Sequence, residues 1–250
     1  MNKFYSKNYW SAGFHSKLYD LLSPESYFDS LRRVVAALPV EKNLSLLDAG
    51  CGSGLLLQFL QTRIREGMVY TGMDLLNSGV GQVLRRARNL GVIEAVSCFQ
   101  SDFTKPLPVS RKKFDLIVVH FSLYTLKSKE SRKSSLENLR AVLKQGGRII
   151  LVNPSVDYNP DAIIEQSIQL IRERQGLIIS LIKKYMIYPF TKILGLRFIQ
   201  KQLKSEKWQG YTHEKFSQEI EEAGFAIQKI EKVYAESAFL GIANLFRMKN

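Results

Sequence analysis

The sequence predicts an α/β protein with a mostly parallel sheet and helices on both of its faces. Short, almost wholly apolar segments alternate with amphipathic helical patterns up to residue 155, which is typical of parallel strands buried on both sides. At the C-terminus, two strand patterns are joined too closely for a crossover connection, so they predict an antiparallel hairpin. Together these observations predict a seven-stranded sheet with a helical insertion after the fifth strand.

Each predicted element has a local signal. Ser23-Pro24-Glu25 predicts an N-cap followed by proline at the first helical position, and this helix runs to about Ala37. A last helix ends before Gly224, which suits the C′ position, and a turn is expected around 235–237. The predicted strands are Leu44–Asp48, Met68–Asp74, Ala95–Gln100, Phe114–His120, Arg148–Asn153, Ala226–Val233 and Ala238–Met248, and the intervening helices are about Leu55–Arg65, Ser78–Leu90 and Lys129–Leu143.

The chain divides into three predicted parts. Residues 1–40 form a helical lid, residues 41–155 and 208–250 form the core, and residues 156–207 form the insertion. Pro189 is expected to kink or separate two helices of the insertion. Residues 172–207 contain nine Lys or Arg but only two Glu, which indicates either a helix at an anionic membrane surface or a cap over an apolar pocket. The basic side is Lys192, Arg197, Lys201 and Lys204, and the apolar side is Phe190, Ile193, Leu194, Phe198 and Ile199.

The composition limits the classes of protein. A net charge of +13 suggests an anionic partner, such as a membrane surface, a nucleic acid or an acidic substrate, unless it serves solubility alone. Two cysteines, Cys51 and Cys98, cannot build a disulfide framework and suit a reducing compartment. The first residues lack the apolar core of a signal peptide, and no segment is apolar enough to span a membrane. We therefore expect a cytoplasmic protein, with docking at the membrane periphery left open.

The segment "SLLDAGCGSG", residues 45–54, runs from an apolar strand into glycines at alternate positions. A dinucleotide-binding loop has the spacing G-x-G-x-x-G, whereas here the third glycine lies one position earlier, which suits a nucleoside better than a pyrophosphate. The second strand ends at Asp74, whose carboxylate can accept both hydroxyls of a ribose. The third strand ends near Asp102 and Phe103, which offer an acceptor and a ring to adenine. All of these residues fall at the sheet edge where ligands bind in open α/β folds.

Five motifs in this order resemble those of class I S-adenosylmethionine-dependent methyltransferases, which have a Rossmann-like sheet. They are "LLDAGCGSG", "YTGMD", "FQSDFTKPLP", "FDLIVVH" and "LKQGGRIILVNP". The resemblance implies S-adenosylmethionine as the cofactor, and no metal site is predicted. The residues implied at the cofactor are Asp48, Gly50 and Gly52 around its methionine end, Asp74 on its ribose and Asp102 with Phe103 at its adenine, with Cys51, Leu75, His120 and Tyr19 as further contacts.

His120 is the first candidate for a general base, because it ends the fourth strand beside the expected sulfonium and imidazole titrates near neutrality. A role as a cofactor contact without proton transfer is equally open. His15 and Tyr19 are the second candidates. Family members often close an N-terminal segment over the cofactor, and the aromatic residues available for such a lid here are Tyr5, Tyr9, Trp10 and Tyr19.

The predicted reaction is transfer of a methyl group to a small, largely apolar metabolite, with oxygen or carbon preferred over nitrogen as the acceptor atom. The methyltransferases of quinone biosynthesis are loosely similar in length and in having a helical segment at this place. A nucleic-acid methyltransferase is the alternative suggested by the charge, and a non-catalytic, membrane-docked cofactor-binding protein is another. Asn153-Pro154-Ser155 is similar to the motif of amino-group methyltransferases, but it follows the fifth strand instead of the fourth, and we interpret it as a turn.

Overall fold

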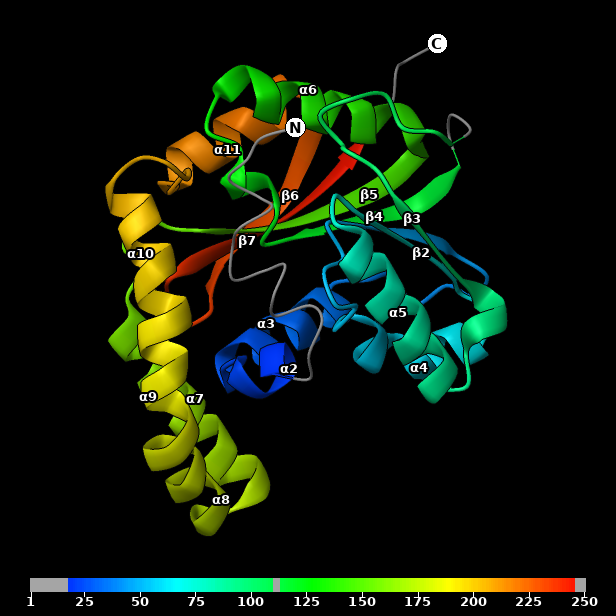
Figure 1. Ribbon diagram of the computed structural model, residues 1–250. Helices are drawn as coiled ribbons and strands as arrows, with labels where there is room; N and C mark the ends of the chain where they lie inside the picture. Colours follow the sequence, from blue (N-terminus) through cyan, green and yellow to red (C-terminus); the bar gives the residue numbers. More distant parts are fainter. Residues whose placement is uncertain (1–17, 110–112, 246–250) are drawn as a thin grey trace.

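The computed structural model describes residues 18–109 and 113–245, which form a seven-stranded sheet with helices around it (Figure 1). The strand order is β3-β2-β1-β4-β5-β7-β6. Neighbouring strands from β3 to β5 are parallel, and β7 is antiparallel to both β5 and β6. The mostly parallel sheet with a C-terminal antiparallel hairpin is therefore confirmed. The strands are β1 (Ser45–Ala49), β2 (Val69–Asp74), β3 (Val96–Gln100), β4 (Phe114–His120), β5 (Leu143–Pro154), β6 (Phe225–Val233) and β7 (Ala238–Leu245).

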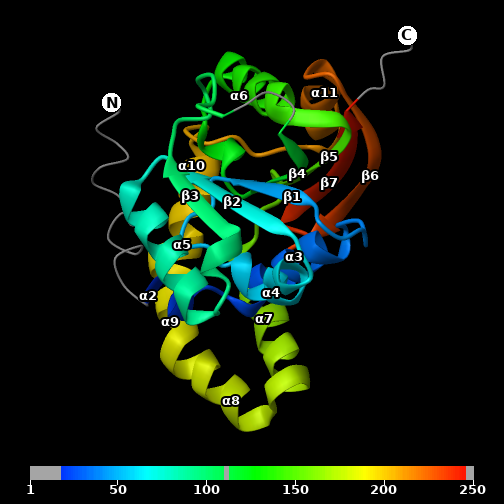
Figure 2. The ribbon, with the colours of Figure 1, turned by 90° about the vertical axis from the view of Figure 1, so that its right-hand side faces the viewer.

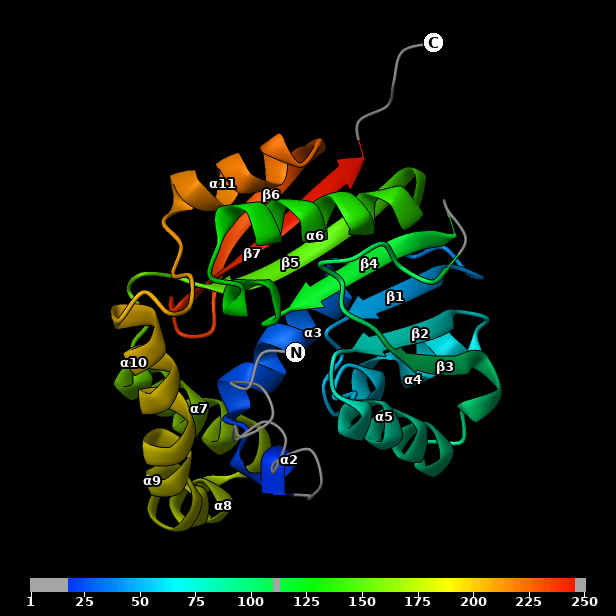
Figure 3. The same cartoon turned by 45° about the horizontal axis from the view of Figure 1, so that its top comes forward.

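Helices cover both faces of the sheet, as Figure 3 shows. Successive residues of β1 point to opposite faces, so Leu46 joins one hydrophobic core and Leu47 joins the other. This two-sided burial is what the uninterrupted apolar strands predict. One face is covered by α3 (Glu25–Ala36), α4 (Leu57–Arg65), α5 (Asn77–Asn89) and α7 (Pro160–Gln175), and the other by α6 (Lys129–Val142) and α11 (His213–Glu222). Short 3₁₀ turns precede β3 (η1, Ile93–Ala95) and follow β4 (η2, Leu123–Thr125).

The insertion is a helical hairpin that projects from the rest of the molecule (Figure 2). After α7, the chain reverses at Gly176, whose φ of +93° favours glycine. A continuous helical rod then returns over residues 177–204. It consists of α8 (Leu177–Ile182), a π-helical turn (η3, Lys183–Ile187), α9 (Tyr188–Phe190), a second π-helical turn (η4, Thr191–Leu196) and α10 (Arg197–Lys204). None of the helices that the structure describes is long and apolar enough to cross a bilayer.

Three local predictions are wrong in detail. Pro24, instead of Ser23, is the N-cap of α3. Asn153 and Pro154 are the last residues of β5 and not a turn, since proline is tolerated at the end of a strand. Of the two alternatives expected for Pro189, the separation of two helices is wrong, because the chain stays helical on both sides of it. The wider π-helical turns on either side accommodate its missing amide hydrogen and its ring.

Candidate active site

The glycine loop lies between β1 and α4, at the carboxyl edge of the sheet. Gly50 has a φ of +83°, and a Cβ at this position would lie 2.4 Å from the Cβ of Ser122. Ser122 belongs to the segment after β4, and its hydroxyl donates to the carbonyl of Ala49 at 2.9 Å. A Cβ on Gly54 would similarly lie 2.9 Å from Val83 of α5. The absence of a side chain at Gly50 and Gly54 therefore allows two neighbouring elements to close around the loop.

Asp74 ends β2 with a buried carboxylate beside this loop. Its Oδ2 accepts a hydrogen bond from the amide of Gly52 at 2.9 Å, and its Oδ1 accepts one from the amide of Leu76 at 2.8 Å. Burial raises the pKa of Asp74, and these backbone hydrogen bonds oppose the rise. Each carboxylate oxygen has lone pairs beyond the one used here, so Asp74 suits a pair of neighbouring hydroxyls.

A cavity of about 1190 Å³, including its open mouth, connects the glycine loop with the inner side of the insertion. We call its two ends the loop end and the aromatic end. No lysine or arginine lines the cavity in the part of the chain that the structure describes. The loop end is lined by Gly50, Cys51, Gly52, Asp74, Leu75 and Phe103, and the aromatic end by Tyr27, Phe121, Tyr124, Tyr158, Leu196, Ile199 and Tyr234.

The aromatic end contains two strained residues that face each other. Phe121 has a φ of +50° and Tyr234 a φ of +58°, and their ring centroids lie 5.1 Å apart. A left-handed conformation costs a non-glycine residue roughly 1–2 kcal/mol, and such strain is concentrated at functional sites. Neither residue could be predicted from the sequence, because neither a phenylalanine nor a tyrosine signals a positive φ.

His120, at the end of β4, lines the cavity, and its ring centroid lies 4.9 Å from that of Tyr27 and 4.8 Å from that of Phe121. The hydroxyl of Ser30 donates to the carbonyl of Tyr27 at 2.8 Å, and Ser30 Oγ lies 2.9 Å from His120 Nε2. Since a carbonyl only accepts, Ser30 offers a lone pair to the imidazole, which assigns the hydrogen to Nε2 and leaves Nδ1 as an acceptor. Burial lowers the pKa of His120 to about 3, so the ring is neutral at physiological pH.

Asp48 and Asp102 are not among the described residues that line the cavity. Asp48 is buried and accepts a hydrogen bond from the Tyr70 hydroxyl at 2.6 Å. Burial raises the pKa of Asp48 to about 7, against the opposing effect of this hydrogen bond. Asp102 closes a local turn, where its Oδ1 accepts from the amide and the hydroxyl of Thr104 at 3.0 and 2.7 Å. Contacts of either carboxylate with the cofactor stay predictions.

The two cysteines, distant in sequence, are neighbours in the structure. Cys51 Sγ lies 3.8 Å from Cys98 Sγ. A Cβ on Gly72 of β2 would lie 2.9 Å from the Cys98 sulfur and 3.1 Å from the Cys51 sulfur, so this glycine makes room for the pair. The hydrogen bond with Cys98 and burial raise the pKa of Cys51 well above its ordinary value. Cys51 is therefore a thiol at neutral pH, which disfavours a nucleophilic role.

The predicted lid is described only in part. Leu22, which ends α2 (Leu18–Leu22), lines the cavity together with Ser23 and Pro24. Tyr19 lies in α2, but its side chain is outside what the structure describes. The other predicted lid or base residues, His15, Tyr5, Tyr9 and Trp10, lie outside the described residues.

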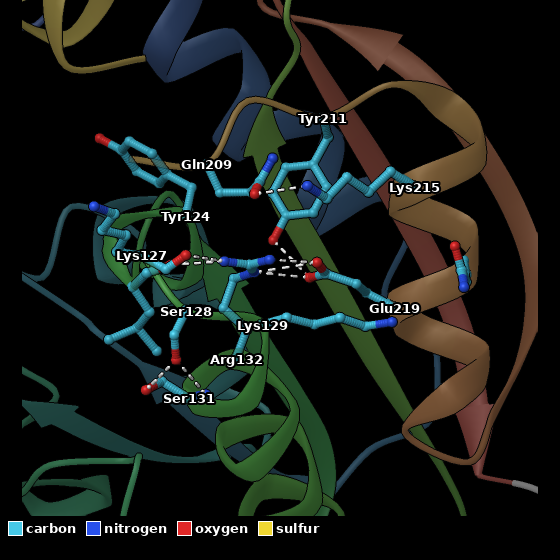
Figure 4. Close-up of polar contacts among 12 residues, drawn as sticks. Tyr124, Lys127, Ser128, Lys129, Ser131, Arg132, Gln209, Tyr211, Lys215 and Glu219 are labelled. Carbon is cyan, nitrogen blue, oxygen red and sulfur yellow. Dashed lines mark hydrogen bonds and ion pairs between the residues drawn. The ribbon is translucent and has the colours of Figure 1, made fainter. Parts of the chain in front are cut away.

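A buried ion pair that no sequence pattern indicated holds the segment after β4 (Figure 4). The Arg132 guanidinium, from α6, binds the Glu219 carboxylate of α11 with distances of 2.9 Å from Nε and 2.6 Å from Nη2. Its Nη1 donates to the carbonyls of Leu126 and Lys127 at 2.9 and 2.8 Å. The Tyr211 hydroxyl donates a further hydrogen bond to the Glu219 carboxylate at 3.0 Å. This network fixes the segment that follows the cavity-lining turn η2.

The chain matches a protein family described as methyltransferase domain over residues 40–224. Among curated proteins, the mRNA cap guanine-N(7) methyltransferase of Schizosaccharomyces pombe is 31% identical over 119 residues, which are 45% of this chain and 32% of that protein. The match therefore spans about a third of the length of this relative.

Solved structures of similar fold come from bacteria and archaea. A SAM-dependent methyltransferase from Aquifex aeolicus superposes with a TM-score of 0.62 and 18% identity, covering 93% of this chain and 98% of that one. A SAM-dependent methyltransferase from Methanosarcina mazei gives a TM-score of 0.57 and 17% identity, covering 86% of this chain and 98% of that one. At these identities the similarity shows the fold.

Proposed function

The chain belongs to the methyltransferase-domain family, with S-adenosylmethionine as its cofactor, and we propose that it methylates a small, largely apolar acceptor at oxygen or carbon. One observation carries this proposal: the cavity continues from the loop end into an aromatic end that no described lysine or arginine lines. Such a lining favours an uncharged, apolar molecule, because a phosphate or carboxylate buried there would lack a cationic partner.

The residues at the loop end fit the cofactor. The backbone of Gly50 and Gly52 lines the cavity, Asp74 presents a carboxylate with free acceptor capacity, and Phe103 offers a ring to a base. When bound, S-adenosylmethionine supplies a methyl group that is already activated on a sulfonium. The contribution of the chain is therefore mainly alignment of the acceptor, which is worth roughly 7–11 kcal/mol in well-oriented systems.

His120 has a limited role as a base under this proposal. An imidazole with a pKa of about 3 is too weak a base to ionise a neutral hydroxyl. Its Nδ1 can still accept a proton from an oxygen that has become strongly acidic by gaining a methyl group. His120 therefore either takes this late proton or serves only as a neutral contact in the cavity.

A second candidate acceptor is a capped RNA. The similarity to the Schizosaccharomyces pombe mRNA cap guanine-N(7) methyltransferase and the net charge of +13 favour it. The cavity argues against it, because the phosphates of a cap require Arg or Lys partners near the base. The match to this cap methyltransferase also covers fewer than half of the residues of this chain.

The two candidates can be separated by transfer of a labelled methyl group. The full chain is incubated with labelled S-adenosylmethionine and either a lipid-soluble cell extract or capped RNA. We expect label in a small, organic-extractable product. Asp74→Ala should lower the yield more than about tenfold through lost cofactor binding, whereas Asp157→Ala, which removes an exposed carboxylate, should not. Label in capped RNA alone would replace the proposed acceptor with the second candidate.

A further inference from the structure

The helical rod of residues 177–204 carries a row of large apolar side chains that are exposed to solvent. Their exposed fractions lie between 42% for Leu181 and 75% for Ile178. A contiguous exposed apolar patch is unusual on a soluble surface and marks a site of interaction. We call this row the apolar ridge; it consists of Leu177, Ile178, Leu181, Ile182, Tyr185, Met186, Phe190, Ile193 and Leu194.

The ridge follows a repeat of four residues, with pairs at 177/178, 181/182, 185/186 and 193/194 and with Phe190 alone at the fourth step. In a regular α-helix with about 3.6 residues per turn, such a repeat rotates around the axis by about 40° per step. The two π-helical turns, Lys183–Ile187 and Thr191–Leu196, hold more residues per turn and reduce this rotation. The π-helical turns therefore keep the ridge on one side of the rod.

The opposite side of the rod faces the protein. Tyr188 is buried, and its hydroxyl accepts a hydrogen bond from the amide of Glu25 in α3 at 3.3 Å. Thr191, Leu196 and Ile199 line the cavity. The apolar side predicted from the sequence is thus divided: Ile199 points inward, whereas Phe190, Ile193 and Leu194 belong to the exposed ridge. The rod separates the cavity from whatever covers the ridge.

The excess of positive charge on the rod favours an anionic partner for the ridge. Residues 177–204 contain six lysines or arginines and no aspartate or glutamate. Lys192 pairs with Asp161 of α7, and none of the other five pairs with a described acidic side chain. A second copy of the chain on this surface would bring like charges together, which disfavours self-association. Anionic lipid headgroups satisfy the cations, while the acyl region accepts the apolar side chains.

We propose that the apolar ridge and its flanking cations dock this protein on a membrane surface that contains anionic phospholipids. Apolar side chains of such a helix enter the boundary between headgroups and acyl chains, and the lysines extend toward the headgroups. After docking, only the helical rod would lie between the aromatic end of the cavity and the bilayer. A lipophilic acceptor could then pass from the membrane to the cavity, a consequence that rests on the proposed function.

Vesicle flotation with the full chain tests this proposal. Vesicles of phosphatidylcholine alone are compared with vesicles that also contain phosphatidylglycerol. We expect strong binding only to the mixed vesicles, and a loss of more than about tenfold in partitioning for Ile178→Ser with Met186→Ser. The matched control is Val40→Ser with Val156→Ser, two exposed apolar residues outside the rod, which should bind within about threefold of wild type.

A charge variant tests the basic component separately. Replacing Lys184, Arg197, Lys201 and Lys204, which are exposed and have no described acidic partner, by Gln should also reduce partitioning more than about tenfold. The control removes the same charge from exposed positions elsewhere, with Lys42, Arg85, Arg88 and Lys133 replaced by Gln. Circular dichroism confirms that each variant folds.

Three outcomes would overturn the membrane proposal. The first is that the wild-type protein does not float with mixed vesicles, and the second is that the control variants lose as much partitioning as the ridge and charge variants. The third is that the protein does not bind vesicles but forms a lipid-free dimer, which the ridge variant abolishes. Because the readout needs no turnover, a protein that floats but transfers no methyl group supports the docking surface and contradicts only the proposed function.

Discussion

Two buried titratable residues near the cavity respond to pH in opposite directions. Burial raises the pKa of Asp48 from 3.8 to about 7 and lowers the pKa of His120 from 6.5 to about 3. Between about pH 4 and 6.5, Asp48 is protonated in the folded protein and ionised in the unfolded chain. In the same range, His120 is neutral in the folded protein and protonated in the unfolded chain. Asp48 therefore makes stability fall as pH rises and His120 makes it increase, so their contributions nearly cancel.

Asp48→Asn should unmask the contribution of His120. Relative to wild type, the free energy of unfolding of this variant is expected to increase by roughly 1.4 kcal/mol per pH unit between about pH 4.5 and 6.5. Urea denaturation of both proteins at several pH values measures this difference, in which the contributions of all other groups cancel. Parallel pH profiles would show that Asp48 titrates at its ordinary pKa in the folded protein.

The loop end of the cavity could be predicted from the sequence, whereas the aromatic end could not. Gly50, Asp74 and Phe103 lie at the carboxyl ends of β1, β2 and β3, and parallel strands bring these ends to one edge of the sheet. The rings of Tyr158 and Tyr234, in contrast, come from segments far apart in the chain, with centroids 6.1 Å apart. No local pattern marks side chains that meet only through tertiary packing.

At the scale of elements, the turn between β6 and β7 stores backbone strain beside the cavity. Tyr234, Ala235 and Glu236 are consecutive residues with φ values of +58°, +52° and +59°. Hydrogen bonds of Ser237 hold the end of the turn. Its hydroxyl donates to the carbonyl of Ala235 at 3.2 Å, and its carbonyl accepts from the amide of Ser155 at 2.9 Å. Since glycine adopts such φ values at no steric cost, the strain can be removed one residue at a time.

Glu236→Gly should stabilise the protein by up to about 1 kcal/mol, because Glu236 is exposed and the relief of its left-handed φ, worth roughly 1–2 kcal/mol, exceeds the roughly 0.5–1 kcal/mol of backbone entropy that glycine adds to the unfolded chain. The control Glu137→Gly, at an exposed position of helix α6, should destabilise by about the same amount. Urea denaturation of the two variants measures both effects. Destabilisation by both substitutions would mean that the turn is not strained in solution.

The elements themselves were largely predictable, and the exceptions have physical causes. Strand β4 has the expected bounds, but β5 begins at Leu143, five residues before the expected Arg148, because Leu143 pairs with Phe114 across a bulge. Arg132 is also unexpected on the buried side of α6, since its burial depends on Glu219 of a distant helix. Pairings between distant segments decide both features.

At the scale of the whole molecule, the positive charge and the cavity are separate features. The chain has a net charge of +13, yet no lysine or arginine is among the described residues that line the cavity. A charge distributed in this way governs which surfaces attract the protein and how fast they do so. It does not select what the aromatic end binds.

Increasing salt should therefore separate the binding of polyanions from methyl transfer. We expect the affinity for RNA to fall by more than about tenfold between about 50 and 200 mM salt, as counterion release requires of a surface with several phosphate contacts. Methyl transfer to an uncharged acceptor in vesicle-free solution should change by less than about twofold. No described lysine or arginine lines the cavity, and the carboxylate of Asp74 within it is buried, where salt screens charges much less than at the surface. Fluorescence anisotropy of labelled RNA and initial rates of transfer, taken over the same salt series, give the two measurements. If the transfer rate instead falls in parallel with RNA affinity, the acceptor is a polyanion and a capped RNA becomes the better assignment.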